Sequence, residues 1–491
     1  MSDKTRAPVL PRPAAADPGP DLRRWWILPV LLTGMFMAQF DLYVVNVAAP
    51  TLQRDIGAGP AALELIVAGY GFTYAAGLIT FGRLGDLVGG RTMFVYGALA
   101  FVVASLLCGL AQSPAQLVAA RLVQGLTGAA MVPQVLGLIT RIFPAAERPK
   151  ALAWFGVTIG VGAVAGQVAG GAMLESNVFG LGWRIIFLVN VPIGLIAAWF
   201  AQRLLPRHAG GARPKLDPLG AIGISGGIAL ILVPLMLGRT EGWPLWTWAC
   251  LLASIPVLAL TVVWERALAT RGGEPMLDLE LLRNSVFVRG LVVSVGVFSS
   301  FFSFMFTITL VLQSGLGLRP LEAGIVFTPL GLAFAAASIA SPRIAAKQGS
   351  RLVTVGTVVA GVGLAGTLWV LTSSGADTSV ARLIAPMMLI GFGNGLAVPA
   401  LTGSVLAGAR PKHAGAAAGI LTTSQQFASA AGVAALGAVF FQVLGDGTGV
   451  ARFARADAWV VGIDLGLIAL AFAASLLLPR PARLAAAAAS R

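Results

Sequence analysis

Fourteen long apolar runs divide this chain, and they constrain its fold more than any other feature. A helix needs about 20 apolar residues to cross a bilayer. Hydrophobic residues make up 57% of the 491 residues, enough for about fourteen such helices. The runs lie near residues 27–49, 61–81, 92–112, 115–139, 151–173, 184–204, 217–237, 244–264, 286–312, 322–341, 352–372, 381–406, 415–441 and 458–478. The sequence therefore predicts an all-α membrane protein with 14 spans.

The composition excludes several other classes of protein. Charged residues are only 11% of the chain, against roughly 25% in a soluble protein, which excludes a soluble enzyme and a disordered chain. The apolar runs are continuous rather than alternating, so a β-barrel is not expected. The 61 glycines fit close helix packing in lipid. Cys108 and Cys250 both lie in apolar runs and form no disulfide framework.

The positive charge is distributed as membrane topology requires. The net charge of +14 would suggest nucleic acid in a soluble protein, but no nucleic-acid module is present. Of the 34 Lys and Arg residues, all but eight fall at the two termini and in the connections on their side of the membrane. Because Lys and Arg collect in cytoplasmic loops, both termini are expected in the cytoplasm. The eight are Arg121, inside a run, and Arg54, Arg184, Arg239, Arg319, Arg382, Arg452 and Arg455 on the opposite side.

An internal repeat predicts the organisation of the chain. Residues 148–150 and 410–412 both read Arg-Pro-Lys, at an offset of 262, and residues 89–91 resemble 349–351 at an offset of 260. We therefore expect two six-helix bundles with two extra transmembrane helices between them. Parallel halves of this kind form a central binding site at mid-membrane. The predicted parts are a disordered cytoplasmic tail (1–26), an N-terminal bundle (27–204), a linker with two additional spans (205–285), a C-terminal bundle (286–478) and a cytoplasmic tail (479–491).

Charged residues inside the apolar runs are the first functional candidates, because hydrocarbon makes charge costly. Asp41 and Arg121 both lie about 9 Å below the outer edge of a ~30 Å hydrocarbon core. Equal depths predict an ion pair, in which Asp41 takes and releases a proton and Arg121 tunes its pKa. The alternative is a static structural pair. Asp464 lies at a similar depth and is expected to reach toward the outer interface, with a second proton site as the alternative.

Two glycine-rich segments predict close helix approach. The loop after the second run contains Gly82, Asp86, Gly89 and Arg91, which would form either a cytoplasmic latch or an ordinary tight loop. The fifth run carries small residues on one face. Its packing candidates are Gly162, Gly166, Gln167, Gly170 and Gly171.

Aromatic and polar side chains inside the runs are candidates for a central cavity. Aromatic rings in the first and ninth runs would bind aromatic or cationic compounds, although lipid-facing packing is an alternative. The candidates are Phe36, Phe40, Asn46, Gln124, Phe298, Phe302, Gln313, Asn394 and Gln425.

Several kinds of chemistry lack their sequence signals. The dipeptide Gly-Lys never occurs, so the phosphate-binding loop of ATP-driven proteins is missing. The two histidines, His208 and His413, fall outside the apolar runs. The sequence therefore predicts no metal site, no catalytic triad and no cofactor.

Three motifs resemble the major facilitator superfamily, in particular its 14-span drug:proton antiporter branch. The string from Asp41 to Pro50 is similar to the helix 1 signature of that branch, with Tyr43 in place of the usual Thr. The stretch from Trp183 to Gly194 resembles the start of helix 6. Leucine, arginine, glutamine and glycine positions of the helix 4 motif are matched by Leu117, Arg121, Gln124, Gly125 and Gly128.

Two further motifs match only partly. Leu87 and Gly90 stand where the family's loop 2–3 motif has basic residues, and Gln167 replaces the proline of its helix 5 antiporter motif. The resemblance implies proton transfer by Asp41 and Arg121 and a latch at Asp86.

The resemblance also implies a function. A monomer in a bacterial cytoplasmic membrane would export amphipathic, cationic or aromatic drugs by alternating access, driven by the proton gradient. Its partners would be the drug or metabolite, protons and the lipid bilayer. The alternatives are a narrow exporter of one metabolite or antibiotic, a proton-coupled importer, and a non-transporting membrane sensor or scaffold. A membrane-embedded enzyme is disfavoured because no nucleophile–base set is visible.

Overall fold

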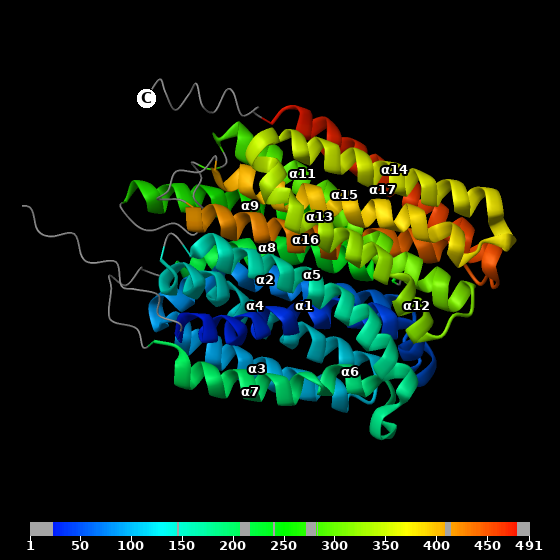
Figure 1. The fold of residues 1–491 in the computed structure, drawn as a ribbon, viewed down its shortest axis with the longest axis horizontal. Helices are drawn as coiled ribbons and strands as arrows, with labels where there is room; N and C mark the ends of the chain where they lie inside the picture. Colours follow the sequence, from blue (N-terminus) through cyan, green and yellow to red (C-terminus); the bar gives the residue numbers. More distant parts are fainter. Residues whose placement is uncertain are drawn as a thin grey trace, which may run out of the picture.

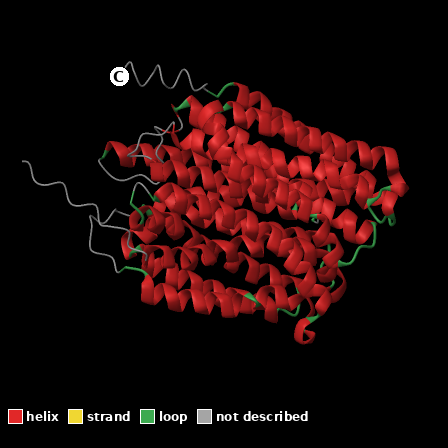
Figure 2. Cartoon of the chain, in the orientation of Figure 1, coloured by secondary structure: helices red, strands yellow, loops and turns green. Residues whose placement is uncertain are grey.

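The computed structural model describes residues 23–144, 147–206, 217–238, 241–271, 281, 283–407 and 414–478. These residues form helices joined by short connections, and no strand occurs among them (Figure 2). In the N-terminal part the helices are α1 (Arg23–Ile56), α2 (Pro60–Val88), α3 (Gly90–Leu110), α4 (Pro114–Ile142), α5 (Arg148–Ser176), η1 (Val178–Gly180), η2 (Gly182–Arg184), α6 (Ile185–Leu188) and α7 (Asn190–Leu204). In the remainder they are α8 (Pro218–Leu237), α9 (Leu245–Thr270), α11 (Ser285–Leu310), η3 (Val311–Gly315), α12 (Pro320–Val326), α13 (Thr328–Gln348), α14 (Arg351–Ser374), η4 (Gly375–Asp377), α15 (Val380–Ala407), α16 (Ala414–Leu444) and α17 (Val450–Leu476).

The predicted membrane architecture is confirmed. Within the described ranges, 13 helical segments are long and apolar enough to span a bilayer, and α8 contributes a shorter apolar segment, Leu219–Ile231. Each predicted run coincides with one of these segments. Several helix ends differ from those of the predicted runs. Helix α1 begins at Arg23, inside the predicted tail, and α17 begins at Val450, eight residues before the predicted run. Residues 1–22 and 479–491 of the predicted tails lie outside the described residues.

The two halves repeat one packing pattern. In the N-terminal half α1 packs on α5, α4 packs on α2 and α3, and α3 packs on α7. In the C-terminal half α11 packs on α16, α15 packs on α13 and α14, and α14 packs on α17. The halves meet where α2 contacts α16 and where α5 contacts α12 and α13. Helices α8 and α9 pack on each other, with α8 beside both α2 and α16 (Figure 1).

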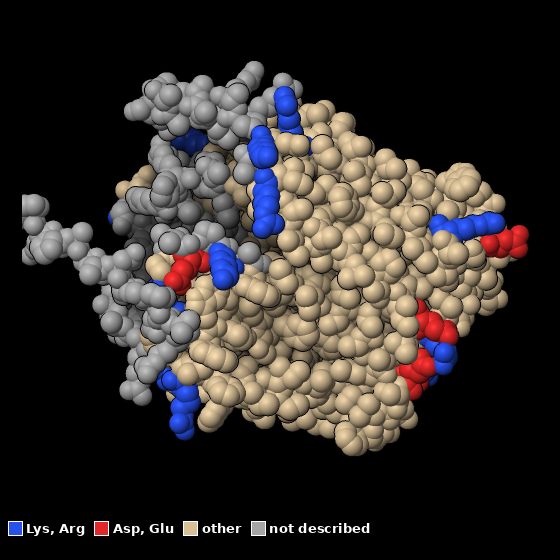
Figure 3. Space-filling model, in the orientation of Figure 1, with Lys and Arg blue, Asp and Glu red and all other residues tan. Residues whose placement is uncertain are grey.

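The two ends of the helices define two sides of the molecule. We call the side where α1 begins and α17 ends the terminus side, at the left of Figure 1, and the other the far side. Figure 3 shows that charged side chains on the visible face gather toward these two sides, with a broad uncharged band between them. Arg54, Arg319 and Arg382 lie at helix ends on the far side, as the alternation of runs predicts. The uncharged band matches what a bilayer requires of a protein surface.

Local sequence sets the start of α4, and with it the depth of Arg121. Ser113 precedes the helix, and its hydroxyl accepts a hydrogen bond from the backbone N–H of Gln116 at 3.3 Å. Pro114 occupies the first helical position, where its missing N–H costs nothing. Arg121 therefore lies two turns inside the helix from its far-side end.

Candidate functional site

Asp41 and Arg121 lie together in the interior of the N-terminal half. Asp41 is in α1 and Arg121 is in α4, and neither side chain has exposed surface. The Nη1 group of Arg121 donates a hydrogen bond to Oδ2 of Asp41, which makes a buried ion pair. The equal depths expected from the sequence thus correspond to direct contact.

Polar side chains complete the hydrogen bonding around this pair. Gln124 Nε2 donates to Asp41 Oδ1 at 2.8 Å and to Ser105 Oγ at 2.9 Å, while its Oε1 accepts from Arg121 Nη1 at 2.7 Å. Asn190 of α7 donates to Asp41 Oδ1 at 3.2 Å. The Asp41 carboxylate therefore joins α1, α4 and α7, and the predicted cavity residue Gln124 belongs to this network.

The guanidinium of Arg121 is also held by α2. Its Nε donates to the carbonyl oxygen of Ile66 at 3.0 Å, and its carbon lies 4.4 Å from the ring centre of Tyr70, a cation–π contact. Gly125 permits this approach, because a Cβ there would lie 2.2 Å from the carbonyl oxygen of Tyr70. Gly125 of the helix 4 motif thus lets α4 lie close to the α2 groups that hold Arg121.

Burial makes the charge balance of this pair critical. Removing an ion from water costs several kcal/mol even after relaxation, and the cost is offset only by close pairing and hydrogen bonding. A proton on Asp41 would cancel its charge and leave Arg121 uncompensated. The arrangement can therefore convert the binding of one proton into a change of contacts among three helices.

Three predicted packing glycines of α5 lie against α1, the helix that carries Asp41. Cβ atoms at Gly162, Gly166 and Gly170 would lie 2.8, 2.8 and 2.5 Å from atoms of α1. At Gly166 the nearest atom is the carbonyl oxygen of Phe40. Small residues on this face let the two helices touch along their backbones.

The other two residues of the α5 motif lie at the contact between the halves. A Cβ at Gly171 would lie 2.5 Å from the carbonyl oxygen of Pro320 in α12, and one at Gly324 would lie 2.5 Å from that of Gln167. The Gln167 side chain is buried, and its amide has no hydrogen-bond partner among the described residues. Gln167 therefore occupies this interface where the family motif has proline.

Aromatic side chains connect the halves near Asp41. Tyr43 of α1 packs against Phe302 of α11, with ring centres 5.3 Å apart, although the sequence did not single out Tyr43 for this contact. Phe298 stacks on Phe302 at 6.3 Å, and Phe36 stacks on Phe40 at 5.9 Å. The aromatic candidates thus belong to α1 and α11, and one pair of rings closes the space between these helices.

The remaining polar candidates have different environments. Gln313, in the π-helical turn η3, donates to the carbonyl oxygen of Val47 at 2.9 Å and so links the halves. Asn394 donates to a carbonyl one turn earlier in its own helix. Asn46 is buried and Gln425 is half-buried. Among the described contacts of these four side chains, that of Gln313 is the one hydrogen bond that links the halves.

The predicted latch is described only in part. Gly89 has a φ of +97°, which separates α2 from α3 in a conformation that favours glycine. Arg91 donates to the carbonyl of Gln202, in the same half of the protein. Gly82 lies near the end of α2, and the Asp86 side chain is outside the described residues. A latch across the halves therefore stays a prediction.

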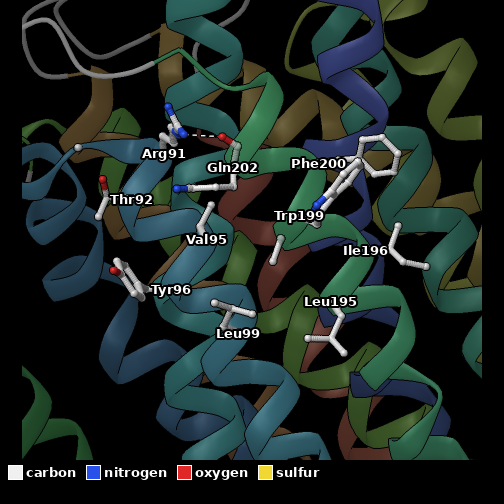
Figure 4. A pocket seen from close by; sticks show the side chains of 12 residues that line it. Arg91, Thr92, Val95, Tyr96, Leu99, Leu195, Ile196, Trp199, Phe200 and Gln202 are labelled. Atoms are coloured by element: carbon white, nitrogen blue, oxygen red, sulfur yellow. Dashed lines mark hydrogen bonds between the residues drawn. The ribbon is translucent and has the colours of Figure 1, made fainter.

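A surface groove lies between α3 and α7 (Figure 4). It has a volume of about 1160 Å³, and Arg91, Tyr96, Leu99, Ile196 and Trp199 are among its lining residues. The side chains of Tyr96, Ile196 and Trp199 are exposed. None of the nine predicted cavity residues lines it. The groove opens on the outer face of the N-terminal half, where lipid is expected, and is separate from the Asp41 network.

Buried acids elsewhere correct the sequence prediction. Asp464 was expected to reach the outer interface, but it has no exposed surface and lies 2.7 Å from the hydroxyl of Ser303, so that expectation is wrong. Asp457 is equally buried in α17. Asp457 lies one residue before the start of the predicted run, so the sequence prediction missed it. Glu64, inside the second run, is also buried and packs beside Gly437 of α16.

Two repeated helical halves that pack against each other within a membrane are the architecture of a membrane transporter. Residues 31–433 match the family model of the Major Facilitator Superfamily. The chain belongs to this superfamily, and the resemblance inferred from its motifs is confirmed.

Relatives and solved structures agree with this assignment. The chain is 37% identical over 436 residues to the "Probable actinorhodin transporter" of Streptomyces coelicolor, covering 89% of this chain and 75% of the relative. It is 33% identical to a puromycin resistance protein of Streptomyces alboniger, covering 97% and 94%. Its fold resembles the crystal structure of a bacterial homolog of the human lysosomal transporter Spinster, in an inward-facing and occupied conformation. The TM-score is 0.68 at 15% identity, covering 94% of this chain and 97% of that one.

Proposed function

We propose that this transporter is a proton-coupled antiporter that exports amphipathic, cationic or aromatic compounds. The observation that supports this most is the fully buried pair of Asp41 and Arg121, because α1, which carries Asp41, also contacts α11 and α12 of the other half. Substrate and proton would compete for the charge of Asp41. The affinity for each then depends on the other, as coupling requires.

The proposed cycle is alternating access. With the protein open to the cytoplasm, Asp41 loses its proton as the substrate binds. After the halves rock to the outward-facing state, an external proton reloads Asp41 and the substrate leaves. The proton gradient is the energy source, and the cycle needs no cofactor.

Charge distribution supports the proposed orientation of the chain in the membrane. By the alternation of the apolar runs in the sequence, all but eight of the 34 Lys and Arg residues are expected on the same side as the termini, and such residues favour the cytoplasm. We therefore propose that both termini lie in the cytoplasm. We also propose that the protein is a monomer in a bacterial cytoplasmic membrane.

Contacts between the halves support an inward-facing assignment of the structure. Arg319, before α12, forms an ion pair with Glu175 at the end of α5, and Gln313 binds the Val47 carbonyl. These contacts lie on the far side. With the terminus side in the cytoplasm, the protein is closed toward the outside.

Gly171→Ala is expected to weaken this closure. Its Cβ would lie 2.5 Å from the carbonyl oxygen of Pro320, so the far-side ends of the halves must separate. Distances between spin labels at Asp55 and Asp377, on the two halves, should shift toward longer values. Gly160→Ala is the matched control, because its Cβ would make ordinary 3.7 Å contacts with the Phe334 ring. Equal distance distributions in both variants would refute the role of Gly171.

Dye transport tests the proposed function. In inverted vesicles, the protein should accumulate ethidium, a planar cation, when a proton gradient is imposed. An uncoupler should abolish this accumulation. Accumulation that persists with the uncoupler, or proton-driven uptake in the opposite direction, would refute the antiport.

A narrow-specificity exporter is the second candidate. The relatives include proteins named for actinorhodin transport, tetracenomycin C export and cephamycin export, and each of these names gives one compound. A susceptibility panel with and without the protein separates the two candidates. A broad exporter should lower sensitivity to several unrelated cationic dyes, whereas a narrow exporter should protect against one chemical class only.

A further inference from the structure

Helix α17 carries two buried carboxyl groups that the proposed coupling through Asp41 does not use. Asp457 and Asp464 have no exposed surface. They are seven residues apart, which places them two turns apart on one face of the helix, about 10 Å along its axis. Ionisable groups at this depth are expensive in a membrane, and they are usually functional.

Hydroxyl groups of α11 line this face. Ser303 Oγ lies 2.7 Å from Asp464 Oδ1, and Thr307 faces Asp457 one turn further along α11. The hydroxyls of Ser303 and Thr307 also have main-chain acceptors in their own helix, at 2.8 and 3.2 Å. Ser303 can therefore donate to its own backbone and accept a hydrogen bond from a protonated Asp464.

Several carboxyl oxygens in this site have no partner. Oδ2 of Asp464 and both oxygens of Asp457 accept no hydrogen bond from the described residues. An ionised carboxylate that is buried without hydrogen-bond partners carries the full free-energy cost of desolvation, whereas a protonated carboxyl avoids most of that cost. Oxygens without hydrogen-bond partners are therefore typical of buried carboxyl groups that are protonated.

Charged groups on the surrounding helices lie too far along them to act as counter-ions. The elements packed on α17 are α11, α14, α16, η3 and η4, and α16 and η3 contain no charged residue. On the others and on α17 itself, the charged side chains are near helix ends: Arg289, Arg351, Asp377, Arg452 and Arg455. Among the described residues of these elements, no basic side chain lies at the level of Asp464, whereas Arg455 lies about 3 Å along the helix axis from Asp457.

The internal repeat relates this site to the Asp41 network. Adding the repeat offsets of 260 and 262 to position 41 gives positions 301 to 303, so Ser303 in α11 lies at the level that corresponds to Asp41 in α1. In the N-terminal half the first helix supplies the acid and α7 supplies Asn190. In the C-terminal half the first helix supplies a hydroxyl, and α17, which corresponds to α7 in the packing, supplies the acid Asp464. Each half thus buries a carboxyl between its first and last helices.

The site also lies close to the contact between the halves. Phe302, next to Ser303 in α11, packs against Tyr43 of α1 at 5.3 Å. A change at Asp464 that shifts α11 would therefore move an aromatic contact between the halves.

We propose that Asp464, with Asp457 two turns away, is a second proton-binding site, and that each transport cycle moves a proton through it in addition to the one on Asp41. The step is the reversible transfer of one proton between a carboxyl oxygen and water. The claim that this proton is transported rests on the proposed antiport. The claim that the site binds a proton is independent of it.

Infrared spectroscopy of the full-length protein in lipid tests proton binding. At about neutral pH, the wild-type protein should show a C=O stretching band of protonated carboxyl groups, and Asp464→Asn should lose part of it. Ser303→Ala should keep that component but shift its frequency, because a hydrogen-bond partner is lost. Asp377→Asn, at an exposed acid of the same half, should leave it unchanged. An identical band in the wild type and Asp464→Asn would overturn the site, since residue 464 would then be ionised.

Ethidium gradients at steady state test whether this proton is transported. At a pH difference of about one unit, each coupled proton multiplies the sustainable dye gradient about tenfold. Asp464→Asn should therefore sustain a gradient about tenfold smaller than the wild type, with its ethidium transport still abolished by an uncoupler. If Asp464→Asn loses the infrared component but sustains the same ethidium gradient as the wild type, the claim that this proton is transported is refuted. If the wild type moves no ethidium against a gradient, the proposed function fails, while the infrared result stands by itself.

Discussion

Asp41→Asn is expected to abolish proton-driven accumulation of ethidium in inverted vesicles. Asparagine keeps the shape of the side chain and can still accept a hydrogen bond from Gln124, but it cannot bind or release a proton. It also leaves Arg121 as a buried charge without its counter-ion, and removing one partner of a buried pair typically costs about 3–5 kcal/mol. We therefore expect a lower melting temperature as well as the loss of coupled transport. Flow of dye down its own gradient should be retained.

A second variant separates coupling from stability. Asp41→Asn combined with Arg121→Gln removes both charges, so the melting temperature should recover relative to Asp41→Asn alone. Proton-driven accumulation should stay absent. Asp55→Asn, an exposed acid near the end of the same helix, should behave like the wild type. Full proton-driven accumulation by Asp41→Asn would show that Asp41 is not needed for coupling.

Gly166→Ala is expected to have the second-largest effect. Its Cβ would lie 2.8 Å from the carbonyl oxygen of Phe40 and 2.9 Å from Cβ of Tyr43. Backbone atoms cannot yield as a flexible side chain can, so α1 must move away from α5. Overpacking of this kind costs about 1–3 kcal/mol, and it displaces the helix that carries Asp41. The melting temperature and the ethidium accumulation rate should both fall.

Gly156→Ala is the matched control for this prediction. It lies in the same helix, and a Cβ there meets nothing within 4 Å. Replacing glycine with alanine inside a helix is by itself favourable, by up to about 1 kcal/mol. Gly156→Ala should therefore melt at the wild-type temperature or above it. If Gly166→Ala melted as high as Gly156→Ala, the close contact between α1 and α5 would not be important for stability.

Hydropathy and charge were sufficient to predict the architecture. Long apolar runs fix the number of helices, because a bilayer leaves no alternative for backbone hydrogen bonds. Depth counting placed Asp41 and Arg121 at one level, and the structure has them in contact. The glycine spacing of the fifth run predicted a packing face, which the structure assigns to α1.

The sequence did not predict which side chains of different helices contact each other. Asn190 and Ser105 complete the Asp41 network, but nothing in their own runs indicates which helix they face. Asn190 lies within the stretch that resembles the family's helix 6, and that was the only signal available. Asp457 was missed because the far-side end of α17 is extended by residues that carry charges, and hydropathy alone places the boundary after them. Asp464 was misassigned because depth does not report which face of a helix is buried.

Proton release on substrate binding tests the central claim most directly. Ethidium is added to the purified full-length protein in weakly buffered detergent solution, and a pH indicator reports the protons released. The competition between substrate and proton at Asp41 predicts release by the wild type of about one proton for each ethidium bound, and no such release by Asp41→Asn. Equal release by the two proteins, or ethidium binding to the wild type without any release, would contradict it.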